Sequence, residues 1–236
     1  MPRVERGAHV TLVALVYRSM RWLEWCMAGV EAAHTEAKYR WLVVANDADG
    51  EVISALQDTD FDWVDHRNVN PGEWYIPRVY RAWNRGVLEA RTPQVVMLNS
   101  DMWASDFWLD ELLDTKRGRP QTVPTSLLVE SGRMESAMPE YVRDFGRNPD
   151  AFDAAGFKDH AATLRQLGGR EPGRLFMPIL VDRQEFMDVG GYPEGNPPGT
   201  TGDKDLIRRY KKAGFDHVTA LGSVVYHVQT GEQEWP

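Results

Sequence analysis

The sequence predicts an α/β fold, with one domain over 1–236 and a mostly parallel central sheet that has helices on both faces. Short apolar runs alternate with amphipathic stretches in the first half, which is typical of parallel strands joined by crossover helices. A chain of 236 residues can bury one large core, and it contains no internal repeat or low-complexity linker. Several apolar runs end in polar or acidic residues, as is common where an open sheet binds a ligand.

The first half is predicted as four strands joined by helices. Residues 10–16 form a continuous apolar run, which is typical of a strand buried on both faces. Apolar residues at helical spacing follow and predict a helix over 20–33. The same patterns place further strands at 40–45, 61–65 and 95–98, and further helices at 52–57, 75–90 and 106–113.

The second half is less regular. Residues 115–172 mix Pro, Gly and charged residues, and we expect one or two helices there, the best candidate being 151–167. A strand is predicted at 175–181 and a helix at 203–213, which Gly214 ends. The last strand is predicted at 217–226 and delivers His227 at its end.

Composition excludes several classes of protein. The formal net charge of −8 and the pI near 5.3 do not favour a surface built mainly to hold nucleic acid phosphates, and a local basic groove stays as the alternative. Cys26 is the single cysteine, so the chain has no internal disulfide and no cysteine metal cluster. No apolar run reaches the length of a membrane span, and no signal peptide is visible. We therefore expect a soluble cytoplasmic protein.

The strand at 95–98 carries the most informative residues. It delivers Asn99 and Asp101, two positions apart, at the edge of the sheet where ligands bind. Two oxygen-bearing side chains at this spacing can reach one hard divalent cation. The alternative is that these residues only cap the next helix, because Asn, Ser and Asp favour such positions.

Two related classes of nucleotide-binding site are not favoured. A Rossmann dinucleotide site needs a Gly-x-Gly-x-x-Gly loop after the first strand, and here that strand ends in Tyr17-Arg18-Ser19. The same turn lacks the glycine-rich basic loop of a sugar-phosphate nucleotidyltransferase, which stays as an alternative function. Aspartates or asparagines instead follow the strands at 40–45 and 95–98.

Taken in order, the motifs resemble those of the family 2 glycosyltransferases, which are inverting enzymes with the GT-A nucleotide-sugar-binding fold. The resemblance spans residues 10–227. Its motifs are Val16-Tyr17-Arg18, Asn46-Asp47-Ala48-Asp49, Asn84-Arg85-Gly86, Asn99-Ser100-Asp101, Gly190-Gly191-Tyr192, Gly202-Asp203-Lys204-Asp205-Leu206 and His227. The chain departs from the family at Asn99, which replaces the first acid of the Asp-x-Asp-like metal motif, and at Gly202, which replaces a Glu. The resemblance implies a donor-binding half over 10–114 and an acceptor and catalytic half over 115–236.

The resemblance implies a divalent cation, Mn²⁺ or Mg²⁺, that neutralises the diphosphate of the donor. Asp101 and His227 are its expected ligands, and Asn99 adds a neutral carbonyl or acts through water. Manganese tolerates an imidazole ligand better than magnesium does. The alternative for His227 is a structural histidine at a strand end.

For the donor, the resemblance implies a UDP-sugar, with a GDP-sugar as the second choice. Tyr17 offers a ring for stacking on the base, and Asp47 or Asp49 can accept from the base or ribose. Asp49-Gly50 can equally be a simple turn. Arg85 shares a helix face with Arg78 and Arg81, which is either phosphate-binding or solvated. Asn99 and Ser100 complete the donor candidates.

The implied reaction transfers the sugar with inversion to a hydroxyl acceptor of unknown class, in one displacement. Asp203 is the expected general base, preferred over Asp205, and a helix N-cap is the alternative role for Asp203. Gly191, Tyr192 and Asp205 are the acceptor-side candidates. Because Asn99 and Gly202 depart from the family, a non-catalytic module that binds nucleotide sugars or glycans is the alternative from another class.

Overall fold

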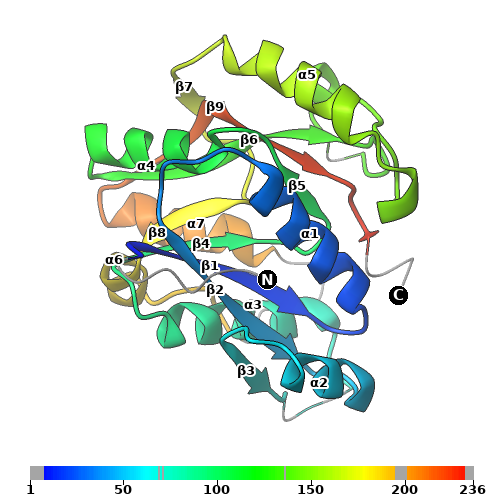
Figure 1. Cartoon of the computed structure of the whole chain (residues 1–236). Helices are drawn as coiled ribbons and strands as arrows, with labels where there is room; N and C mark the ends of the chain where they lie inside the picture. The colour runs from blue at the N-terminus through cyan, green and yellow to red at the C-terminus, as the bar shows by residue number, and fades with distance from the viewer. Residues whose placement is uncertain (1–7, 69, 71, 136, 195–200, 232–236) are drawn as a thin grey trace.

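The computed structural model describes residues 8–68, 70, 72–135, 137–194 and 201–231. Within them, nine strands form one sheet in the order β3-β2-β1-β4-β8-β6-β9-β5, with β7 also paired to β9. Helices lie on both faces of this sheet, with α1 in front of it and α3 and α7 behind it in the view of Figure 1. The predicted α/β architecture is confirmed.

The first half closely matches the predicted elements. Its strands are β1 (Val10–Val16), β2 (Tyr39–Asn46), β3 (Trp63–His66) and β4 (Gln94–Leu98). Its helices are α1 (Met20–Ala32), α2 (Gly50–Gln57) and α3 (Tyr75–Glu89). The four strands pair in parallel, because each crossover helix returns the chain to the same edge of the sheet.

The second half contains shorter elements. Its strands are β5 (Met102–Ala104), β6 (Thr122–Glu130), β7 (Arg170–Pro172), β8 (Ile179–Asp182) and β9 (Asp216–His227). Its helices are α4 (Trp108–Gly118), α5 (Ala154–Arg165), α6 (Arg183–Asp188) and α7 (Gly202–Lys212), with the 3₁₀ turns η1 (Pro139–Tyr141) and η2 (Pro149–Ala151).

Strand β6 corrects the sequence prediction, which placed only helices over 115–172. All nine of its residues are buried, and it pairs in parallel with β9 along its whole length. Three hydroxyl residues and Pro124 hide this strand in the sequence, since proline is rare in central strands. Pro124 is accommodated because, in the described residues, β8 pairs with β6 only at Thr125.

Six strands of the described sheet run in the same direction. Strand β8 is antiparallel to both β4 and β6, so β6 and its parallel partner β9 run the same way as β1 to β4. Only β5, β7 and β8 run in the opposite direction. The carboxyl ends of β1, β2, β3, β4, β6 and β9 therefore meet along one edge, which we call the carboxyl edge.

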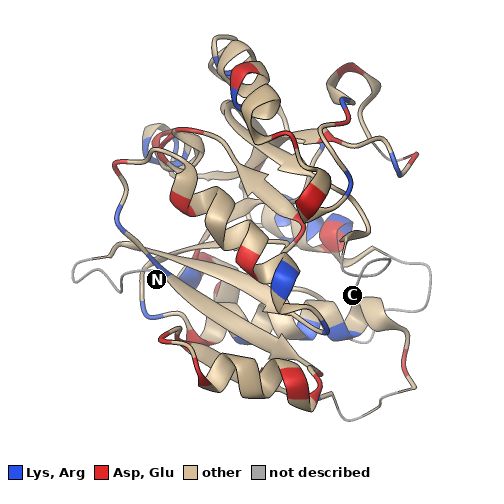
Figure 2. Ribbon diagram, turned by 45° about the vertical axis from the view of Figure 1, so that its right-hand side comes forward, with Lys and Arg blue, Asp and Glu red and all other residues tan. Residues whose placement is uncertain are grey.

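Charged residues lie mainly on helices and loops, while most of the sheet carries uncharged residues (Figure 2). The main core lies between the sheet and its helices, and a second, aromatic cluster contains Trp22, Trp25, Phe145, Phe157 and Tyr226. Cys26 is fully buried in the main core, as its spacing in the sequence indicates. Among the described residues, no helix combines the length and the apolar character that crossing a bilayer requires.

Gly86 allows α3 to pack directly on β1. A Cβ atom at this position would lie 2.4 Å from Cγ1 of Val13, which is fully buried. We expect Gly86→Ala to lower the free energy of unfolding by about 1–3 kcal/mol, the usual cost of overpacking a core. Denaturant unfolding measures this change. Gly50→Ala in α2 is the matched control, since a Cβ there meets nothing within 4 Å. An equal loss in both variants would contradict the packing argument.

Candidate active site

Most of the predicted site residues lie at the carboxyl edge. Tyr17 follows β1, Asp47 follows β2, Asp101 follows β4, and His227 ends β9. Helix α7 also begins at this edge, with Asp203 in its first turn. The contact between Asp203 and Tyr80 shows this, since Tyr80 lies in the N-terminal half of α3. Residues separated by more than 200 positions in the sequence are thus collected along one line.

Strand pairing brings Asp101 and His227 together. Asp101 precedes β5, and the first residue of β5, Met102, lies opposite His227 in the antiparallel ladder with β9. As a result, Oδ1 of Asp101 lies 3.5 Å from Nε2 of His227. The other carboxylate oxygen of Asp101 accepts a hydrogen bond from the backbone N–H of Gly231 at 3.1 Å. The two expected metal ligands are therefore neighbours, although their binding of metal stays a prediction.

Glu130, which the sequence analysis did not select, lies on the other side of the imidazole. It ends β6 directly opposite His227, and its Oε1 lies 3.1 Å from Nδ1 of His227. Burial alone would lower the pKa of His227, but the carboxylates of Asp101 and Glu130 outweigh it and raise that pKa to about 10. Burial likewise opposes ionisation of Asp101, yet His227 lowers its pKa. The metal-free cluster therefore holds an imidazolium between two carboxylates.

The donor set at Asp101 and His227 fits one divalent cation. Two ligands on adjacent corners of an octahedral ion, each about 2.1 Å away, lie about 3.0 Å apart, close to the observed separation of 3.5 Å. Among the described residues, no three His, Cys, Asp or Glu side chains are grouped to hold a metal. The protein would thus supply two such ligands and leave further positions to the diphosphate, Asn99 or water.

Asn99 and Ser100 lie in the turn before Asp101. Asn99 is half-buried, and its backbone carbonyl accepts a hydrogen bond from the thiol of Cys26 at 3.4 Å. Ser100 is buried. This turn does not cap a helix, because β5 follows it directly. The helix-cap alternative for Asn99 and Asp101 is wrong, and their roles toward metal and donor stay predictions.

Asp47 is held in a polar cluster after β2. Its Oδ1 accepts from the backbone N–H of Asn68 at 2.7 Å, and its Oδ2 accepts from Nε of Arg78 at 2.8 Å. Burial would raise the pKa of Asp47, but these partners outweigh it and lower that pKa. The backbone of Asp47 has a φ of 53°, which costs an ordinary residue about 1–3 kcal/mol. The ionised form of Asp47 is therefore favoured, and Asn68 and Arg78 hold its carboxylate in place.

The remaining donor candidates have partners of differing kinds. The guanidinium carbon of Arg18 lies 4.5 Å from the ring centroid of Tyr17. Asp49 accepts from the N–H of Val52 at 2.9 Å and so caps α2, which begins at Gly50, in place of the simple turn given as the alternative. Arg85 lies on the exposed side of α3 and pairs with Glu89 at 2.8 Å. Their binding of a donor stays a prediction.

Asp203 is half-buried, and both of its oxygens are held by tyrosines. Tyr80 donates to Oδ2 at 3.3 Å and Tyr192 donates to Oδ1 at 3.2 Å. The two rings are stacked, with centroids 4.8 Å apart. Burial raises the pKa of Asp203, although both hydroxyls act against it. In the structure Thr201 occupies the N-cap position of α7, so the cap alternative for Asp203 is wrong.

The acceptor-side candidates surround this aspartate. Asn84 of α3 holds the Gly191–Tyr192 turn, accepting from the N–H of Tyr192 at 2.8 Å and donating to its carbonyl at 2.9 Å. A φ of 59° at Gly191 and the nearby Asn84 side chain require glycine there. Asp205, by contrast, pairs with Arg208 one turn along α7.

The departure at Gly202 has a steric explanation. A Cβ at Gly202 would lie 2.4 Å from the ring of Tyr80. The stacked pair of Tyr80 and Tyr192 therefore occupies the space next to Asp203, and only glycine fits beside it. No signal in the sequence separates Tyr80 from the apolar core stripe of its helix, so its contact with Asp203 could not be predicted. Glu130 could have been noticed as an acid that ends an apolar run.

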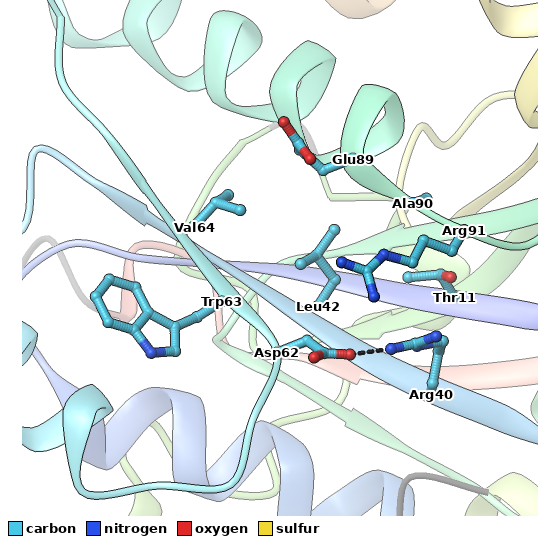
Figure 3. Close-up of a pocket in the computed structure, with 9 residues that line it drawn as sticks. All are labelled: Thr11, Arg40, Leu42, Asp62, Trp63, Val64, Glu89, Ala90 and Arg91. Carbon is cyan, nitrogen blue, oxygen red and sulfur yellow. Dashed lines mark hydrogen bonds and ion pairs between the residues drawn. The ribbon is translucent and has the colours of Figure 1, made fainter. Parts of the chain in front are cut away.

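A pocket in the structure lies away from this site. Its lining includes Thr11, Arg40 and Trp63 from the beginnings of β1, β2 and β3, and Glu89 from the end of α3 (Figure 3). An ion pair between Arg40 and Asp62 lies on its wall. Since these are the amino ends of the strands, the pocket belongs to the edge of the sheet opposite the candidate active site.

No family model and no curated protein matches the chain. Solved structures do match, and one is the crystal structure of GalNAc-T7 with UDP, GalNAc and Mn²⁺. The TM-score is 0.65 at 10% sequence identity, over 93% of this chain and 44% of that chain, so this chain spans less than half of that protein. At this identity the likeness concerns the fold alone. The chain has the fold of a GT-A glycosyltransferase.

Proposed function

We propose that the protein is a metal-dependent inverting glycosyltransferase that moves a sugar from a nucleoside diphosphate to a hydroxyl acceptor. The observation that carries this proposal is the pairing of Asp101 with His227, 3.5 Å apart, at the edge of the sheet where α7 also presents Asp203. Membership of family 2 is part of the proposal, supported by the ordered motifs. The 10% identity to GalNAc-T7 supports no finer assignment.

The donor is proposed to bind at the ends of β1, β2 and β4. Asp101 and His227 would hold Mn²⁺ or Mg²⁺, with Asn99 and Ser100 beside them. Tyr17 offers a stacking surface, and Oδ1 of Asp47 receives one N–H from within the described part of the chain, that of Asn68, so it can accept a further hydrogen bond. GalNAc-T7 was crystallised with UDP and Mn²⁺, which supports a UDP-sugar and manganese. The half over 10–114 thus supplies most of the donor site.

Asp203 is proposed as the general base. Among the tyrosine hydroxyls of the described residues, each of its oxygens accepts one, and a carboxylate oxygen has a second lone pair that can receive the acceptor hydroxyl. The acceptor hydroxyl gives its proton to Asp203, the acceptor oxygen bonds to the anomeric carbon, and the bond from that carbon to the diphosphate breaks. The cation, when bound, neutralises the charge on the leaving diphosphate. Burial raises the pKa of Asp203, which strengthens it as a base.

The half over 115–236 is proposed to choose the acceptor. It contributes Asp203, His227 and the Gly191–Tyr192 turn, which Asn84 ties to α3. Asp205 is the weaker candidate for the base because it pairs with Arg208. A non-catalytic nucleotide-sugar or glycan-binding module is the second candidate. The residues that favour it are Asn99 and Gly202, which depart from the family motifs.

Nucleotide binding tests the proposal. We expect UDP with Mn²⁺ to raise the melting temperature, with about 2.7 kcal/mol of stabilisation when the nucleotide is at 100 times its Kd. UDP without metal should stabilise far less, and GDP with Mn²⁺ is the comparison for the base. Thermal unfolding followed by fluorescence measures all three. If no nucleoside diphosphate stabilises the protein with metal, the proposal fails. Metal-dependent binding of UDP-sugars without transfer or hydrolysis would favour the binding module.

A further inference from the structure

Glu130 has a buried carboxylate at the carboxyl edge, and the proposed reaction does not use it. We propose that Glu130 is a positioning residue that holds His227 so that Nε2 is directed to the cation at Asp101. This inference rests on the proposed function, because it requires a cation at Asp101. Glu130 is only 6% exposed, and a buried carboxylate is costly unless it is paired and hydrogen-bonded.

The three side chains form a line with His227 in its middle. Nε2 of His227 lies 3.5 Å from Asp101, and Nδ1 lies 3.1 Å from Glu130. The two ring nitrogens point away from each other, so Glu130 and Asp101 cannot both reach a cation bound at Nε2. When Nδ1–H donates to Glu130, Nε2 keeps its lone pair for the metal. Carboxylates that orient metal-binding histidines act in this way.

The hydrogen bonds of Gln229 show how Glu130 interacts with its neighbours. Oε1 of Gln229 accepts from the backbone N–H groups of Arg133 at 2.8 Å and Met134 at 3.1 Å. Its Nε2 is thereby left to donate to Oε1 of Glu130 at 3.0 Å. Rotating the amide by 180° would place an oxygen against the carboxylate and an NH₂ group against two N–H donors. Glu130 therefore accepts from Gln229, and as a carboxylate it is also the acceptor for an Nδ1–H of His227.

The backbone at Gln229 and Thr230 adopts an uncommon conformation that allows these contacts. Gln229 and Thr230 have φ values of 64° and 57°, in the left-handed region that non-glycine residues rarely adopt. This turn places Gln229 over Glu130 and returns Gly231 to Asp101, where its N–H donates to Oδ2. Backbone strain of this kind is unfavourable in an ordinary turn, and it gathers at functional sites. The turn therefore donates hydrogen bonds to both Glu130 and Asp101, the outer members of the three-residue line.

The test measures Mn²⁺ binding in the presence of UDP, by electron paramagnetic resonance of the free ion. Glu130→Ala is expected to weaken Mn²⁺ binding by about 10–100-fold, the usual effect of losing a carboxylate that orients a metal ligand. Pulsed resonance detects the imidazole nitrogen bound to Mn²⁺, and this ¹⁴N signal should be lost or reduced in Glu130→Ala. Glu130→Gln retains an oxygen acceptor, so it should keep the nitrogen signal and bind Mn²⁺ with an affinity between wild type and His227→Ala.

Glu185→Ala is the matched control. It breaks an ion pair with the buried Lys116 near the opposite edge of the sheet, so it should change stability and leave Mn²⁺ binding unchanged. A folded Glu130→Ala with wild-type affinity and nitrogen signal would overturn the inference. If Glu130→Ala does not fold, the measurement on Glu130→Gln tests the inference instead. Wild-type affinity for Mn²⁺ in Glu130→Gln would overturn the inference. Absence of Mn²⁺ binding by the wild type with UDP would instead refute the proposed function, and this inference with it.

Discussion

Asp203→Asn is expected to lower kcat by about 10²–10⁴-fold, the range that a general base contributes, while the affinity for donor stays unchanged. The amide oxygen still accepts from one tyrosine hydroxyl, and its NH₂ group donates to the oxygen of the other, so the stack beside it is retained. What it loses is the ability to take the acceptor proton. Release of UDP from a panel of UDP-sugars and acceptors measures kcat, and calorimetry measures donor affinity.

The pH profile gives a second readout for Asp203. Burial raises its pKa above 3.8, and a base works only when ionised. The wild-type rate should therefore fall as the pH drops through the raised pKa of Asp203, and Asp203→Asn should lack this limb. Asp205→Asn is the control, because that side chain pairs with Arg208. A large loss in Asp205→Asn with full activity in Asp203→Asn would reverse the assignment.

Asp101→Asn is expected to abolish most of the Mn²⁺-dependent binding of UDP. The loss should exceed the 10–100-fold typical of a residue that only supports a ligand, since Asp101 is the one anionic ligand proposed in its turn. Calorimetric titration of UDP with and without Mn²⁺ measures it. Binding without metal should be unchanged.

The Asp101→Asn variant without metal gives an independent check on the role of Asp101. Asp101 is the main group that raises the pKa of His227 to about 10 against the effect of burial. Asp101→Asn should therefore lower that pKa, which NMR titration of the imidazole detects. Asn99→Ala is the comparison for binding, since Asn99 contributes a neutral oxygen. If Asn99→Ala weakened UDP binding more than Asp101→Asn does, the proposed ligand set would be wrong.

Local patterns predict the elements whose apolar residues form an uninterrupted run or recur at strict helical spacing. Strand β1 is an uninterrupted apolar run, and its predicted bounds are those observed. Helix α3 was recognised from apolar residues at helical spacing, within one residue of its observed end. Strand β6 was missed because hydroxyl residues and Pro124 interrupt its apolar run. Its burial comes from β9 and β8, whose positions beside it are not encoded within the strand.

The sequence predicts which residues belong to the site better than it predicts the contacts between them. Asp101, His227 and Asp203 were selected as residues that follow strands or open a helix, and the structure places all three at the carboxyl edge. The roles of Glu130 and Tyr80 escaped prediction because each depends on a partner that is distant in the sequence. Glu130 meets His227 only through the register of β6 with β9. Tyr80 meets Asp203 only because glycine at position 202 leaves room for its ring.

Sequence alone was enough to determine the α/β class, the edge at which polar residues gather, and the chemistry that these residues offer. These properties depend on hydrophobic periodicity and side-chain type, which are local. Tertiary structure decided which residues touch: His227 between Asp101 and Glu130, and Asp203 between two tyrosines. Such contacts depend on strand order and register, and a shift of one residue would turn each side chain to the other face.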